Sequence, residues 1–265
     1  HILSNPLPAP RNITWGTDGP IIVSGDLSLT LNGFQSATLS SGFERFWKSV
    51  TDLKWYPVAT EEAILGRLNV SNSNHAITEV LVYVDDTSAL LQLGVNETYT
   101  LSVLHDSDAI EIHAATIWGA LNAFTTLQQV IVYENDLYFV EDSLSIWDAP
   151  LYPHRGVMID TGRNFILKKK IFDQIDIMSL SKLNTLHWHL DDTQLWPVEI
   201  KSIPEMTKDA YSPREIYTQS DLLEIIAYAK DRNVRVIPEV DMPGHTASGW
   251  KQANPNIVVC ADTWW

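Results

Sequence analysis

Three apolar runs in the second half of the chain each end in polar side chains that could do chemistry. The runs span residues 156–160, 183–190 and 234–240, and they are followed by Arg163, Asp192 and His245. An arginine beside a carboxylate and an imidazole can hold hydroxyl groups and set the charge of a neighbouring acid. Because these residues are far apart in sequence, the fold has to bring them together.

Helical patterns separate the three runs, over residues 170–181 and 220–232. Strand and helix in alternation indicate a parallel sheet. In a parallel β/α barrel the carboxyl ends of all strands open on one face, and that face carries the chemistry. The pattern therefore predicts that Arg163, Asp192 and His245 converge on one pocket.

Carboxylates surround these three residues in the sequence. Asp191 precedes Asp192, while Glu239 and Asp241 alternate at the end of the third run, so that both could point inward. A solvated loop is the alternative for the aspartate pair, and for Arg163 a surface side chain that caps the next helix. A planar guanidinium in a pocket would instead hold two hydroxyls at once.

A metal centre is the main alternative chemistry. His187 and His189 point the same way along a strand and resemble the histidine pair of metal-dependent amidohydrolases, with Asp192, Glu239 or His245 as further ligands. That pair usually lies on a first strand, and here it lies on the second. A hydrogen-bonded histidine pair in a barrel core is the simpler interpretation, so neither metal nor cofactor is expected.

Three motifs together carry a family resemblance. They are HRG and DTGR at residues 154–163, HWHLDDTQ at residues 187–194 and PEVDMPGHT at residues 238–246. In this order and at this spacing they resemble the β-N-acetylhexosaminidases of glycoside hydrolase family 20, in its fungal and animal branch. The resemblance is strong over about residues 150–250 and looser before residue 150.

The resemblance implies an α/β chain in two domains. Residues 1–150 would form an N-terminal α+β accessory domain, and residues 151–265 the first three βα units of a (β/α)8 TIM barrel. A complete barrel needs ~250 residues, so the barrel would be truncated and the chain the N-terminal part of a larger enzyme. Expected strands in the first domain span residues 21–31, 79–84, 99–104 and 109–113, expected helices residues 42–53 and 116–130, and an expected linker residues 147–150.

The implied activity is hydrolysis of terminal, non-reducing β-linked N-acetylhexosamine, from glycans that end in β-GlcNAc or β-GalNAc. Family 20 uses substrate assistance: the 2-acetamido oxygen attacks the anomeric carbon while a glutamate protonates the leaving group. By resemblance, Arg163 holds the hydroxyls at C3 and C4. The catalytic Asp-Glu pair is expected beyond Trp265, so this chain alone is expected to be inactive.

The remaining motif residues are assigned by the same resemblance. A network that sets the pKa of the acid would comprise Asp192, Glu239, Asp241 and His245, supported from behind by His187, His189 and Asp191. Within this network Asp192 is expected to hold the His245 imidazole. A homodimer of the complete enzyme is also implied. A non-catalytic carbohydrate-binding chain that keeps Arg163 remains the alternative.

Composition limits the partners and the compartment. A net charge of −15 and a pI near 4.8 argue against a nucleic-acid partner, and the absence of a long apolar run argues against a membrane. The start at His1 suggests a mature chain, and sequons at Asn12, Asn69 and Asn96 suggest a secreted or lysosomal/vacuolar glycoprotein. Cys260 could pair with another cysteine or be a buried free thiol.

Overall fold

The computed structural model describes residues 5–16, 19–55, 76–105 and 107–259. Contacts divide the chain into two compact units, residues 1–153 and residues 154–265, and each is described by itself. The sequon at Asn69 and the single cysteine, Cys260, lie outside the described residues. No helix in these described ranges is both long and apolar enough to cross a membrane.

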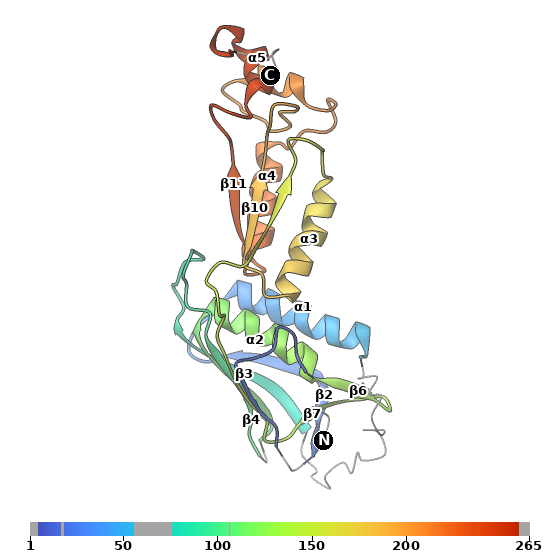
Figure 1. Cartoon of the computed structure of the whole chain (residues 1–265). Coiled ribbons are helices and arrows are strands. Elements are labelled where there is room, and N and C mark those ends of the chain that lie inside the picture. The colour runs from blue at the N-terminus through green and yellow to red at the C-terminus, as the bar shows by residue number, and fades with distance from the viewer. Residues whose placement is uncertain (1–4, 17–18, 56–75, 106, 260–265) are drawn as a thin grey trace. The chain divides into compact units, whose positions relative to one another are not determined.

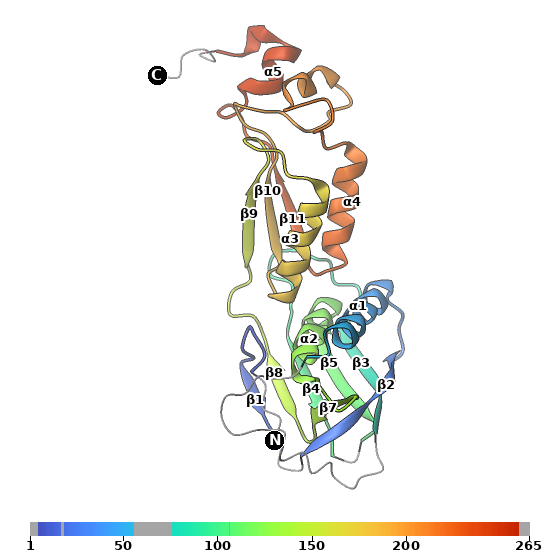
Figure 2. The same ribbon diagram turned by 90° about the vertical axis from the view of Figure 1, so that its right-hand side faces the viewer.

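The first unit is built on a mixed sheet of eight strands with two helices on one face (Figures 1 and 2). Strands β2, β3 and β5 run parallel to one another, and antiparallel strands extend the sheet on both sides. In sheet order the strands are β1 (Asn12–Thr14), β8 (Ser145–Asp148), β4 (Tyr99–Val103), β5 (Ala109–Thr116), β3 (Ala76–Asp86), β2 (Pro20–Leu31), β7 (Leu137–Glu141) and β6 (Val132–Glu134).

Both helices of this unit follow from their sequence patterns. Helix α1 (Ala37–Leu53) begins five residues before the predicted start, because the Ser36 hydroxyl accepts the Leu39 N–H as an N-cap. Its buried residues recur at helical spacing. Helix α2 (Ile117–Val130) is capped by Thr116 and is buried over most of its surface, where it packs against α1 and the sheet. Their apolar faces close the core of the unit.

The predicted linker at residues 147–150 is wrong in its first half. Residues Ser145–Asp148 form β8, which pairs with β4 and with β1. Asp148 is buried and its carboxylate accepts the Tyr99 hydroxyl at 2.9 Å. Strands β1, β6, β7 and β8 were not predicted. Strand β1 pairs with β8 much later in the chain, so no local pattern marks either of them.

The second unit contains a parallel sheet in the order β11-β10-β9, as its three apolar runs predict. The strands are β9 (Gly156–Asp160), β10 (Thr185–His189) and β11 (Arg235–Glu239), and the connecting helices are α3 (Lys168–Leu180) and α4 (Gln219–Lys230). Both helices cover the same face (Figure 2), where Ile175 and Ile225 pack with Trp188 of the central strand. The segments after β10 and β11 carry the 3-10 helix η2 (Pro204–Asp209), the short helix α5 (Ala247–Ala253) and a final 3-10 turn, η3 (Pro255–Ile257).

The opposite face of this sheet carries side chains in aligned rows. In the middle row, Met158 of β9 and Ile237 of β11 flank His187 of β10. The side chain of Met158 is 58% exposed and that of Ile237 is 36% exposed. Within the described part of the chain, this face therefore presents apolar and imidazole groups that no helix covers.

Helices α3 and α4 are joined by an ion pair built on Asp176. Its carboxylate accepts the Tyr228 hydroxyl at 2.9 and 2.8 Å and the Arg232 Nε–H at 2.5 Å. The Arg232 guanidinium lies 3.4 Å from the Tyr228 ring centroid, and that ring stacks on Phe172. Tyr228 of α4 and Arg232, which lies just after the end of that helix, thus meet one carboxylate from α3.

Asp176→Ala is expected to lower the free energy of unfolding by about 1–2 kcal/mol, since charge-assisted hydrogen bonds between two helices are lost. Asp173→Ala is the control, because Asp173 lies in the same helix but forms a solvent-exposed ion pair with Lys170, at 3.0 Å. It is expected to change stability by less than about 0.5 kcal/mol. Both substitutions raise helix propensity alike. Equal losses of unfolding free energy, measured by urea denaturation, would show that the Asp176 contacts do not stabilise the packing of α3 on α4.

Candidate active site

The candidate site lies where the three parallel strands end. Asp160, His189 and Glu239 are the last residues of β9, β10 and β11, and they occupy one row of the sheet register. Arg163, Asp192 and His245 lie in the segments that follow each strand, at the same end. The structure therefore brings together the three residues that the sequence predicts to converge.

Two carboxylates hold Arg163. Its Nη1 lies 2.5 Å from Asp160 Oδ2 and its Nη2 lies 2.6 Å from Asp192 Oδ2. Burial raises the pKa of Asp160, but the side-chain and backbone hydrogen bonds from Arg163 outweigh it and keep that pKa below its usual value. The guanidinium side chain is still 41% exposed, so it remains accessible to a ligand.

Asp160 was not among the predicted site residues. Its Oδ1 also accepts the backbone N–H groups of Gly162 and Arg163, at 3.0 and 3.1 Å, and so forms the turn that aims the arginine. A side chain at position 162 would lie 2.4 Å from the Asp191 carbonyl carbon, which only glycine avoids. The DTGR motif contains the signal, because an aspartate at a strand end two residues before a glycine is typical of such a turn.

Asp192 is almost fully enclosed, because its side chain is only 1% exposed. Its Oδ2 lies 2.6 Å from Arg163, 2.9 Å from His189 Nε2 and 3.7 Å from His245 Nδ1. Its Oδ1 accepts the Thr193 N–H, and its backbone carbonyl accepts the Ser248 hydroxyl. Both oxygens are thereby fixed in place.

His189 lies between two carboxylates. Besides Asp192 at its Nε2, it has Glu239 Oε2 at 3.0 Å from its Nδ1, and the same Glu239 oxygen lies 2.6 Å from His187 Nε2. Burial lowers the pKa of His189, yet the hydrogen bonds to Asp192 and Glu239 raise it by more, so its net pKa lies above the usual value. The two carboxylates thus favour the charged form of this imidazole.

The prediction that Asp192 holds the His245 imidazole differs from the structure. Asp241 accepts from His245 Nδ1 at 2.8 Å, and this hydrogen bond keeps the Asp241 pKa below its usual value. Asp192 is 3.7 Å from the same nitrogen, because its Oδ2 already serves Arg163 and His189. The left-handed backbone of His245 (φ 59°) turns its ring toward the neighbouring aspartate.

Asp191, predicted to support the network from behind, is completely buried. Neither of its carboxylate oxygens has a hydrogen-bond donor among the described residues. Burial, followed by the nearby carboxylates of Asp241, Asp192 and Glu239 and opposed by His189, raises the pKa of Asp191 to about 7. The sequence gives no sign of this burial, since aspartate pairs at strand ends are ordinarily solvated.

Two tryptophans join the segments that follow β10 and β11. The rings of Trp196 and Trp250 meet edge to face at 6.3 Å, and a side chain at Gly249 would lie 2.8 Å from the Trp196 ring. Asp209 joins the segments after β10 and β11 by accepting the Gly249 N–H at 2.8 Å and the Gln252 amide at 2.8 Å. These residues were not predicted, because the contacts join loops far apart in sequence.

Metal-ligand spacing occurs once among the residues that the structure describes. His189, Glu239 and Asp241 each offer a ligand atom, and these atoms lie within 4.8 Å of one another. Glu239 Oε2 already lies between two imidazoles, and Asp241 accepts from His245. The geometry therefore favours a network of imidazole–carboxylate pairs over a metal centre.

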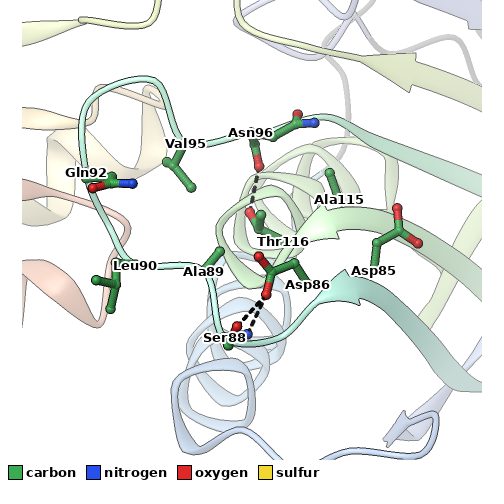
Figure 3. A pocket seen from close by; sticks show the side chains of 10 residues that line it. All are labelled: Asp85, Asp86, Ser88, Ala89, Leu90, Gln92, Val95, Asn96, Ala115 and Thr116. Atoms are coloured by element: carbon green, nitrogen blue, oxygen red, sulfur yellow. Dashed lines mark hydrogen bonds between the residues drawn. The ribbon is translucent and has the colours of Figure 1, made fainter.

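A separate pocket of about 530 Å³ lies in the first unit (Figure 3). Its polar groups mostly satisfy one another: Asp86 accepts from the Ser88 hydroxyl at 2.7 Å, and the Thr116 hydroxyl donates to the Asn96 carbonyl at 2.6 Å. Apolar side chains such as Leu90 and Val95 form the rest of the lining. The lining contains two aspartates but no histidine, lysine or arginine. It therefore lacks the paired acid and base, or cation and carboxylate, that the candidate site contains.

Comparison with known proteins agrees with this placement. The family described as glycosyl hydrolase family 20, catalytic domain, matches residues 152–265, and the family described as beta-acetyl hexosaminidase like matches residues 6–130. Beta-hexosaminidase 1 of Coccidioides posadasii is 50% identical over 269 residues, which cover 98% of this chain and 45% of that protein. The chain belongs to glycoside hydrolase family 20.

Other family 20 proteins show the same relationship. Beta-hexosaminidase of Emericella nidulans is 50% identical over 98% of this chain and 46% of its own length. The crystal structure of Flavobacterium johnsoniae chitobiase, a family 20 protein, superimposes with a TM-score of 0.78 at 25% identity, over 96% of this chain and 37% of that one. The chain thus spans less than half the length of these relatives. Its α/β fold is similar to that of the family 20 structure.

Proposed function

We propose that this chain contributes the sugar-binding end of a β-N-acetylhexosaminidase, which removes terminal β-linked N-acetylhexosamine from glycans. The observation that carries the proposal is Arg163, which is fixed by Asp160 and Asp192 and is still 41% exposed at the end of the sheet. A planar guanidinium can donate two parallel hydrogen bonds to neighbouring ring hydroxyls. The contacts with Asp160 and Asp192 support a fixed orientation of the guanidinium before the sugar binds.

We propose further that residues 151–265 are the first three βα units of a (β/α)8 barrel. The rows of side chains on the uncovered face of β9, β10 and β11 support this, since barrel interiors are filled by such layers. Both outer strands of the sheet also have an edge that no other strand of the described chain pairs. Closure by further strands would cover Met158 and Ile237.

The proposed chemistry is substrate-assisted. The acetamido oxygen at C2 attacks the anomeric carbon while a general acid on a strand other than these three protonates the leaving oxygen. The residues of this chain bind and orient: Arg163 holds the ring, while Asp192, His189 and Glu239 keep the charges around it fixed. Asp241 and His245 lie at the exposed rim, where an acid from another strand would meet them.

The full-length protein is expected to hydrolyse an aryl β-N-acetylglucosaminide and to leave the matching aryl β-glucoside nearly untouched. The glucoside lacks the acetamido oxygen, so the nucleophile itself is missing. Steady-state release of the aryl group from both substrates measures this. Comparable rates on the two sugars would contradict substrate assistance, and sugar binding without turnover of either would support a non-catalytic carbohydrate-binding chain.

Compartment and assembly belong to the same proposal. A secreted or lysosomal/vacuolar glycoprotein would carry glycans at Asn12 and Asn96, and both side chains are exposed in the structure. Chitin-derived oligosaccharides are proposed as one substrate source, since a 32% identical relative is the chitooligosaccharidolytic beta-N-acetylglucosaminidase of Bombyx mori. A homodimer is proposed for the complete enzyme.

A further inference from the structure

Asp191 is the one predicted site residue that none of the contacts above explains. It lies two residues after β10, its side chain is completely enclosed, and both of its oxygens lack a donor among the described residues. An ionised carboxylate in such a place loses its hydration and gains nothing in return. The side chain therefore needs either a donor or a proton.

The charged groups around Asp191 leave no donor for it. Among these groups only the His189 imidazole of β10 would stabilise an ionised Asp191, since the other three, Asp192, Glu239 and Asp241, are carboxylates. The Nε2 of His189 is hydrogen-bonded to Asp192 at 2.9 Å, and its Nδ1 lies at an ion-pair distance of 3.0 Å from Glu239. The imidazole is thus shared by two carboxylates already, and a third would compete with them.

We propose that Asp191 is a positioning residue that carries a proton while the site works, and that its ionisation disrupts the charge arrangement of His189, Asp192 and Glu239. In the neutral form it fills the space beneath the network without adding charge. Once ionised, it would repel Asp192 and Glu239 and weaken their hold on Arg163 and on His189. This role rests on the proposed hexosaminidase function only for the kinetic part of its test.

The direction of the pH effect follows from the site. Burial raises the pKa of Asp191 to about 7 in the folded protein, whereas an aspartate in the unfolded chain titrates near its ordinary value of about 3.9. The folded state thus holds one proton more than the unfolded state between these values. The contribution of Asp191 to stability is fully present below about pH 4 and is lost as the pH rises through about 7.

The test uses the full-length protein labelled with 13C at the aspartate carboxyl carbons. One aspartate signal is expected to titrate near pH 7 and to be missing in Asp191→Asn, a neutral isostere of the protonated acid. In that variant the melting temperature should exceed the wild-type value above pH 7 and match it near pH 4, and the alkaline limb of kcat/KM should shift to higher pH. Asp173→Asn, on the exposed face of α3, should leave all three readouts unchanged.

Each outcome decides the proposal. Titration of every aspartate below about pH 5 would overturn it, and that result needs no variant to fold. If the Asp191 carboxyl titrates near pH 7 but the pH profile of kcat/KM is the same in Asp191→Asn as in the wild type, the positioning role is overturned. The buried proton on Asp191 would then still stand. If neither protein hydrolyses the acetamido sugar, the proposed function fails, but the carboxyl titration and the melting curves still judge Asp191.

Discussion

Replacement of Asp192 by asparagine in the full-length protein is expected to lower kcat/KM on an aryl β-N-acetylglucosaminide about a hundredfold or more. Asp192 is almost fully buried and meets Arg163 at 2.6 Å and His189 at 2.9 Å. The asparagine keeps the shape but removes the charge, so both cations lose their buried partner. Removal of one member of a buried ion pair costs about 3–5 kcal/mol, and each 1.4 kcal/mol is a factor of ten in rate.

Gln194→Ala is the matched control for this substitution. Gln194 lies two residues further along the same segment and its side chain is exposed, so its loss should leave kcat/KM within about twofold of wild type. Melting temperatures of both variants show whether the loss is one of folding. Near-normal kinetics in a folded Asp192→Asn protein would show that this carboxylate does not organise the site.

Replacement of Arg163 by lysine is expected to lower kcat/KM at least tenfold while the melting temperature barely changes. Lysine keeps the positive charge beside Asp160 and Asp192 but loses the planar fork that would hold two ring hydroxyls. A hydrogen bond from a charged donor is worth about 1.5–3 kcal/mol, which corresponds to a factor of ten or more.

Arg235→Lys is the control for the arginine chemistry. Arg235 begins β11, at the end of the sheet opposite to the candidate site, where its Nη2 donates weakly to Thr185 at 3.4 Å. Its replacement should leave kcat/KM unchanged. A lowered melting temperature with normal kinetics in Arg163→Lys would instead support the interpretation of Arg163 as a structural surface residue.

The sequence predicts the second unit well because its strands end in polar motifs. Each of the strands β9, β10 and β11 is an apolar run that ends in a polar motif, and helical patterns separate the runs. Strand β6 pairs with β7 across a tight turn at Asn135 and Asp136, a local signal that was missed. Strands β7 and β8 pair with β2 and β4, which are distant in sequence. Long-range pairing leaves no local period.

Within the candidate site, the motif residues were predictable, whereas Asp160 and the hydrogen-bond partners were not. The motifs place Arg163, Asp192 and His245 at one end of the sheet, because parallel strands share that end. The pairing of Asp192 with His189 depends on the turn at Gly162, and that of His245 on its left-handed backbone. These are three-dimensional consequences of turns, and sequence spacing does not record them.

A crystal structure of the full-length protein with bound N-acetylglucosamine tests the central claim most directly. The account predicts that the Arg163 guanidinium donates to two ring hydroxyls at about 2.7–3.2 Å, while Asp192 remains on His189. Arg163 would then exchange part of its contact with Asp160 for the sugar. A sugar bound elsewhere, with Arg163 still closed between Asp160 and Asp192, would contradict the account.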